Sequence, residues 1–87
     1  MQKWGYCYIS GIKAGLHFET SYPRIVSFDS TEPHVKVEEL RKKPDHEEVF
    51  VVADAIARLG EEGWEMVSVA AHGDYGNVTL FFKRPLP

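Results

Sequence analysis

Four histidines are the residues of this chain best suited to proton transfer or metal binding, and they are spread along its length: His17, His34, His46 and His72. None belongs to a His-Glu-x-x-His motif, and the chain has no Cys-x-x-Cys pair, so the spacing predicts no metal site. Asp74 stands two residues after His72. A carboxylate so close can orient an imidazole for acid-base catalysis or help it bind a metal. A His-Gly-Asp run is also ordinary loop chemistry, which is the simpler interpretation.

The carboxylates and the single thiol offer a second kind of chemistry. Asp54, Glu61 and Glu62 could be paired carboxylates for general acid-base catalysis, but a solvated helix end explains them more simply. Cys7 is a candidate nucleophile, yet its place on a strand among aromatic residues predicts a small buried hydrophobe. The sequence therefore predicts no catalytic residue, no metal ligand and no cofactor.

A basic run, Arg41-Lys42-Lys43, is the feature that best suits a phosphate backbone. The strands also carry aromatic residues on which bases can stack: Trp4, Tyr6, Tyr8, Phe81 and Phe82. Against this interpretation, acidic residues surround the basic run, and 13 acidic against 10 basic residues give a formal net charge of -3. Nucleic-acid binding is therefore a disfavoured alternative.

Length and composition limit the elements that can position these groups. The 87 residues predict a single domain spanning 1–87, because a chain this short buries only about 60% of its unfolded surface and has room for one core. Apolar residues make up 44% and charged residues 26%, which is typical of a folded protein. A single cysteine, no secretory signal and no run of about 20 apolar residues predict a cytoplasmic protein outside the membrane.

Alternating apolar residues predict four strands. They lie at residues 4–9, 24–28, 64–71 and 78–84. The last two form a hairpin, because glycines and Asx residues fill the loop between them. Pro23 cannot donate a ladder hydrogen bond and predicts an edge position for the second strand. The polar stretch 30–45 predicts an exposed connection, with at most a short strand or a helical turn.

The segment Val49-Phe50-Val51-Val52 by itself is typical of a strand, but its surroundings predict a helix over residues 46–59. Pro44-Asp45 supplies a helix stop and an N-cap, and Glu48 stands where a capping box needs its acidic partner. Gly60 is expected to take the left-handed conformation that ends the helix. The predicted buried stripe follows helical spacing. It comprises Val49, Val52, Ala53, Ile56, Ala57 and Gly60.

Three short motifs together carry a resemblance to a known family. They are Leu59-Gly60-Glu61-Glu62-Gly63-Trp64-Glu65-Met66-Val67-Ser68-Val69, the closing Phe81-Phe82-Lys83-Arg84-Pro85-Leu86, and Trp4-Gly5-Tyr6 near the start. The chain resembles a family of short prokaryotic and phage domains, the domain of unknown function numbered four-one-seven-seven, with an enlarged connection over residues 10–45. The resemblance implies a strand, a helix and a two-strand hairpin, and a prokaryotic or phage source. It implies no catalytic residue.

One helix of about 14 residues covers a single face of a small sheet, yet the predicted strands carry apolar residues on both faces. We therefore predict an α+β domain, with an antiparallel sheet of about four strands and one α-helix packed on one face in the order β-β-α-β-β. We expect it to form a homo-oligomer, with a dimer favoured, packed sheet to sheet or through strand edges. The candidate interface residues are Tyr6, Tyr8, Phe28, Leu80 and Phe82.

The function predicted from this pattern is a non-enzymatic oligomeric interaction module or ligand-binding module, with an unidentified protein or small molecule as its partner. Two alternatives stay open. One is a nucleic-acid binder that uses Arg41-Lys42-Lys43 and an exposed aromatic sheet face. The other is a small enzyme with a pocket at a subunit boundary near His72, Asp74 and Tyr75.

Overall fold

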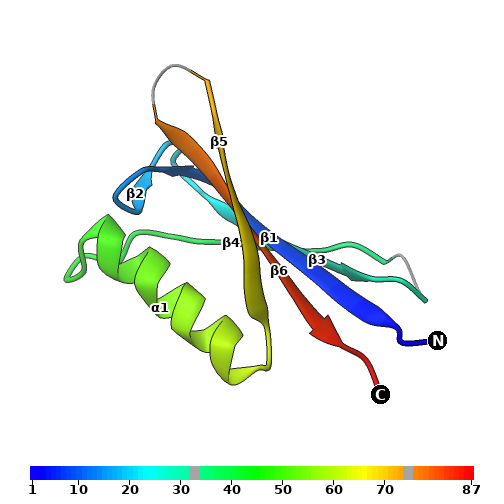
Figure 1. The fold of residues 1–87 in the computed structure, drawn as a ribbon. Coiled ribbons are helices and arrows are strands. Elements are labelled where there is room, and N and C mark those ends of the chain that lie inside the picture. Colours follow the sequence, from blue (N-terminus) through cyan, green and yellow to red (C-terminus); the bar gives the residue numbers. More distant parts are fainter. Residues whose placement is uncertain (32–33, 74–75) are drawn as a thin grey trace.

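A computed structural model describes residues 1–31, 34–73 and 76–87, and within them it contains one helix and one antiparallel sheet. The strands are β1 (Trp4–Lys13), β2 (His17–Phe18), β3 (Arg24–Asp29), β4 (Lys36–Glu39), β5 (Glu65–His72) and β6 (Asn77–Pro85), and the helix is α1 (Glu48–Glu61). The strand order across the sheet is β4-β3-β1-β6-β5. The short strand β2 is not part of this order and pairs with β1 alone among the described strands. Figure 1 shows α1 on one side of the twisted sheet. The predicted α+β class, with one helix and an antiparallel sheet, is confirmed.

The predicted count of about four strands is wrong, because the sheet has six and their order differs from the simple pattern. The additional strands are β2 and β4, both within the stretch 10–45. All four residues of β4 are exposed and three of them are charged, so the sequence offers a short strand here only as one of two possibilities, and the structure has the strand. Backbone pairing with β3 stabilises β4, and the Leu40 N–H then donates to the Pro23 carbonyl oxygen at 2.6 Å. β3 is therefore an interior strand, and the edge position predicted from Pro23 is wrong.

The helix exists as predicted, but it begins and ends about two residues later. Its N-cap is Glu47, which makes no side-chain capping bond, and the expected capping box does not form. The reason is that the Glu48 carboxylate accepts the backbone N–H of Phe18 in β2, at 3.1 Å. At the other end the left-handed residue is Gly63, with φ +90°, and not Gly60.

The C-terminal turn of α1 has the hydrogen bonds of a Schellman motif. The Trp64 N–H donates to the Leu59 carbonyl oxygen at 2.9 Å, and the Gly63 N–H donates to the Gly60 carbonyl oxygen at 3.1 Å. The chain then enters β5, which forms the predicted antiparallel hairpin with β6. The pairing shifts by one residue between Met66 and Ser68, so Val67 is the extra residue of a β-bulge.

The core lies between α1 and the face of the sheet that α1 covers. Cys7 and Ile9 of β1, opposite Phe82 and Leu80 of β6, point into it and are 4% exposed or less. The helix contributes Val51, Val52, Ala55 and Leu59. Only Val52 of these belongs to the predicted stripe. The predicted helical face is therefore wrong by part of a turn, because apolar residues surround most of α1.

Candidate functional site

The open face of the sheet, which α1 does not cover, carries paired aromatic rings. Opposite residues of neighbouring antiparallel strands share a face, and the register places Tyr6 opposite Phe28 and Tyr8 opposite Phe81. The ring centroids of these pairs are 5.7 Å and 6.0 Å apart. Tyr6, Phe28 and Phe81 keep 37–40% of their surface exposed. The structure thus brings together three of the predicted interface residues, Tyr6, Tyr8 and Phe28.

Leu80 and Phe82, the other two predicted interface residues, lie on the covered face instead. They are 4% and 3% exposed and belong to the core under α1. The physical reason is strand alternation, because residues next to each other on β6 point to opposite faces. Phe81, which the predicted set omits, is the β6 aromatic that faces the open side.

β5 is an edge strand, because within the described residues its only strand partner is β6. Met66, Val67 and Val69 are 40%, 48% and 56% exposed, and no charged residue stands between Glu65 and His72. One side of this eight-residue strand therefore offers backbone N–H and C=O groups to solvent beside apolar side chains. An edge of this composition is a template for pairing with another strand.

The flank of α1 that faces β5 is apolar as well. The opposite flank is identified by Arg58, whose guanidinium lies 2.8 Å from the Glu38 carboxylate in β4. Val49, Ala53 and Ile56 lie on the other side of α1 from Arg58, and all three are only half-buried. On the sheet below, Met66 and Val69 share the covered face, opposite Phe82 and Leu80. We call these five residues, Val49, Ala53, Ile56, Met66 and Val69, the β5-side strip.

The basic run predicted for nucleic acid does not join the aromatic rings. The Arg41 guanidinium lies 4.7 Å from the Tyr22 ring centroid and 3.8 Å from the Glu39 carboxylate. Lys42 and Lys43 line a groove of about 490 Å³ between residues 38–44 and α1. The cation that does adjoin the open-face rings is Lys83, whose Nζ lies 4.4 Å from the Trp4 ring centroid.

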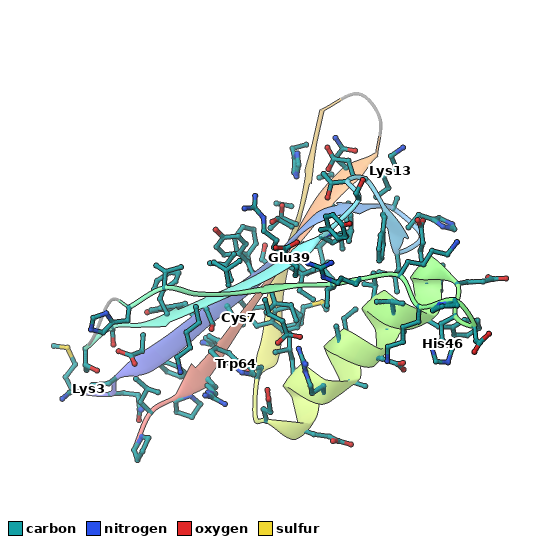
Figure 2. The ribbon with its side chains drawn as sticks, turned by 180° about the vertical axis from the view of Figure 1, so that it is seen from behind. Lys3, Cys7, Lys13, Glu39, His46 and Trp64 are labelled. Carbon is teal, nitrogen blue, oxygen red and sulfur yellow. The ribbon has the colours of Figure 1, made fainter. Side chains whose placement is uncertain are left out.

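Cys7 behaves as the small buried hydrophobe that the sequence predicts. Its side chain is 2% exposed in the core, and Figure 2 shows it on the sheet. Burial, together with the nearby Glu62 carboxylate, raises the pKa of the Cys7 thiol to about 11. The thiol is therefore neutral at physiological pH and is a poor nucleophile.

Trp64 follows the C-terminal turn of α1 and lies beside the sheet (Figure 2). The Arg84 guanidinium stacks 4.3 Å from the Trp64 ring centroid and donates to the Glu62 carbonyl oxygen at 2.8 Å. Gly5 lies under the indole, where an added Cβ would come within 3.2 Å of it. Trp64 is thus explained by packing.

The other candidate chemical residues are not brought into one site. His72 Nε2 lies 3.1 Å from Thr79 Oγ1 on the open face, while Asp74 and Tyr75, the partners predicted for it, lie outside the described residues. Among the residues that are described, no three His, Cys, Asp or Glu side chains gather as a metal site would require. Asp54, Glu61 and Glu62 are exposed on or just after α1. The described part of the chain also has no helix that is long and apolar enough to span a bilayer.

Comparison with protein-family models, with curated proteins and with solved structures finds no match to this chain. The family resemblance of the sequence motifs therefore stays a prediction.

Proposed function

We propose that this chain is a non-enzymatic interaction or ligand-binding module that works as a homodimer joined along β5. The observation that carries the proposal is the unprotected edge: an eight-residue strand whose Met66, Val67 and Val69 are 40–56% exposed. Pairing two such edges satisfies backbone groups and covers apolar side chains at the same time. The half-buried flank of α1 adds further apolar surface on the same side.

The edge is favoured over sheet-to-sheet packing through the open face. The aromatic rings of that face already contact one another in pairs, 5.7 Å and 6.0 Å apart, and two of the five predicted interface residues lie in the core. The open face is then left for the partner or ligand of the dimer. Its rings and Lys83 suit an aromatic or anionic group.

Sedimentation equilibrium at tens of micromolar tests the proposal. We expect a mass of about twice the 9.9 kDa of the chain, and a mass that falls towards 9.9 kDa on dilution. A monomer at every concentration up to hundreds of micromolar would overturn the proposal.

A second candidate function is binding of single-stranded nucleic acid by the open face. The observation that favours it is the row formed by Trp4, Tyr6 and Phe28 beside Lys83, because bases stack on aromatic rings and cations attract phosphates. Quenching of Trp4 fluorescence by a single-stranded oligonucleotide at low salt, lost in a Tyr6→Ala variant, would support it. No binding at about 20 mM salt, where phosphate contacts are strongest, would eliminate it.

A further inference from the structure

We propose that two copies of the chain pair β5 with β5 in one register, antiparallel, with Val69 on the twofold axis. Ser68 then lies opposite Ala70 of the second copy, Met66 opposite Ala71, and Glu65 opposite His72. The inference rests on the proposed homodimer and specifies its interface. The second copy extends the sheet across the edge, so that both helices lie on the same side of one continuous sheet.

The faces of β5 select this register. In a continuous sheet, residues that lie opposite each other must point to the same face. Pairing with β6 places two groups on the two faces. Met66, Val69 and Ala71 share the covered face, and Glu65, Ser68, Ala70 and His72 share the open face.

The register centred on Val69 matches every one of these residues to a residue of the same face, with the bulged Val67 left over in each copy. A register centred on Ala70 leaves Glu65 and Met66 unpaired. A register centred on Ser68 leaves Ala71 and His72 unpaired. The bulge is what allows the full match, because it moves Glu65 onto the same face as His72, seven positions later.

The side chains also complement each other in this register. On the covered face it joins Val69 to Val69 and Met66 to Ala71, which extends the β5-side strip of one copy into that of the other. On the open face it places the Glu65 carboxylate across from an imidazole at both ends of the interface. Within the described residues the Glu65 carboxylate has no ion pair or side-chain hydrogen bond, so it is available. His72 contacts Thr79 through Nε2, which leaves Nδ1 for the carboxylate.

Disulfide trapping tests the register directly. In the Val69→Cys variant two thiols meet across the axis, where opposite Cα atoms of antiparallel strands are about 4.5–5.5 Å apart, within the range of a disulfide. In the matched Ala70→Cys variant each thiol is displaced by one residue from the axis, which puts the Cα atoms about 8 Å apart, beyond that range. Oxidised glutathione is the oxidant, and it accepts the two electrons that two thiols lose on forming one disulfide. Cys7 stays in both variants, because at 2% exposure it is out of reach.

We expect the Val69→Cys variant to form a covalent dimer at least tenfold faster than the Ala70→Cys variant, and the unmodified chain to form none. Equal rates for the two variants in a chain that sediments as a dimer would overturn the register and leave the proposed function standing. A chain that sediments as a monomer would overturn both.

A charge exchange provides a second readout if the cysteine variants fold poorly. Glu65→Lys alone places a cation opposite His72, and we expect it to weaken the dimer about tenfold. Adding His72→Glu places opposite charges across the interface and should recover most of the affinity. A double variant as weak as, or weaker than, Glu65→Lys would contradict the pairing of these two residues.

Discussion

Among the described residues, β4 and β5 are the strands at the two ends of the order β4-β3-β1-β6-β5, and they differ in length, charge and cover. β4 has four residues, three of them charged, and the chain that follows it packs Leu40 into the core under α1. β5 has eight residues, and no charged residue lies between Glu65 and His72. Charged, short or covered edges prevent pairing with other chains. The difference indicates that the β4 edge is protected against strand pairing and that the β5 edge is not, which is why we propose β5 as the surface through which copies associate.

The prediction with the largest expected effect tests whether the part of the molecule next to β4 excludes solvent and reagents. Cys7 lines a groove of about 360 Å³ there, together with Lys36, Val37 and Glu38, yet its side chain is buried. Since burial raises the thiol pKa from 9.0 to about 11, the thiolate fraction near pH 8 falls by about 100-fold. We expect iodoacetamide to alkylate folded Cys7 more than about 100-fold slower than Cys7 in urea, as followed by mass spectrometry.

The same shift fixes a pH dependence of stability. The folded pKa lies above the unfolded one, so the contribution is complete below about pH 9 and is lost as the pH rises through about 11. The free energy of unfolding should fall by about 2 kcal/mol over that window, and less in a Cys7→Ala control. Alkylation at the same rate in folded and unfolded protein would mean that the β4 side is open.

The second prediction compares the two edges by one substitution. Val69 on β5 and Val37 on β4 are 56% and 55% exposed, so lysine at either position costs the monomer little. We expect Val69→Lys to raise the dimer Kd by about 30-fold, because it removes apolar contact and places two cations together at the axis. Val37→Lys should leave the Kd within about twofold. Equal effects of the two variants in sedimentation would remove the distinction between the edges.

The third prediction, with the smallest expected effect, concerns the ion pair between Arg58 of α1 and Glu38 of β4. Arg58 and Glu38 are 2.8 Å apart but 45% and 53% exposed, and solvent screens such pairs. Glu38→Gln should lower the free energy of unfolding by only about 0.5 kcal/mol and leave association unchanged. Glu39→Gln is the control, because its partner Arg41 is 3.8 Å away, and we expect no measurable loss in urea denaturation. A weaker dimer in the Glu38→Gln variant would contradict the assignment of the β4 side as protected.

The sequence predicts the parts of the fold that local signals control. Gly60 and Gly63, just before Trp64, mark the end of the helix, and glycines and Asx residues mark the hairpin loop. The helix and the antiparallel β5–β6 pair that these signals predict are confirmed. The sequence leaves β4 open between a short strand and a helical turn, because its charged residues have low strand propensity and pairing with β3 holds it in place. The start of α1 also differs from the prediction because of a contact that is distant in sequence. The Glu48 carboxylate, expected in a capping box, instead accepts the backbone N–H of Phe18, 30 residues away.

The sequence predicts the buried face of α1 only in part, and the direction of the mistake is informative. The predicted stripe is centred on Val49, Ala53 and Ile56, whereas the buried stripe is centred on Val52, Ala55 and Leu59. The displacement points towards β5, the side on which the monomer leaves apolar residues half-covered. Periodicity measures all the apolar surface of a helix, and it does not separate surface that the chain buries by itself from surface left for a partner.

Hydrogen exchange measured above and below the dimer Kd tests most directly whether the copies join through β5. We expect the backbone amides of residues 65–72 that face away from β6 to exchange at least about tenfold more slowly in the concentrated sample, because pairing gives them acceptors. The amides of residues 36–39 should exchange at the same rate in both samples. Protection that appears on β4, or on neither edge while the mass doubles, would contradict association through β5.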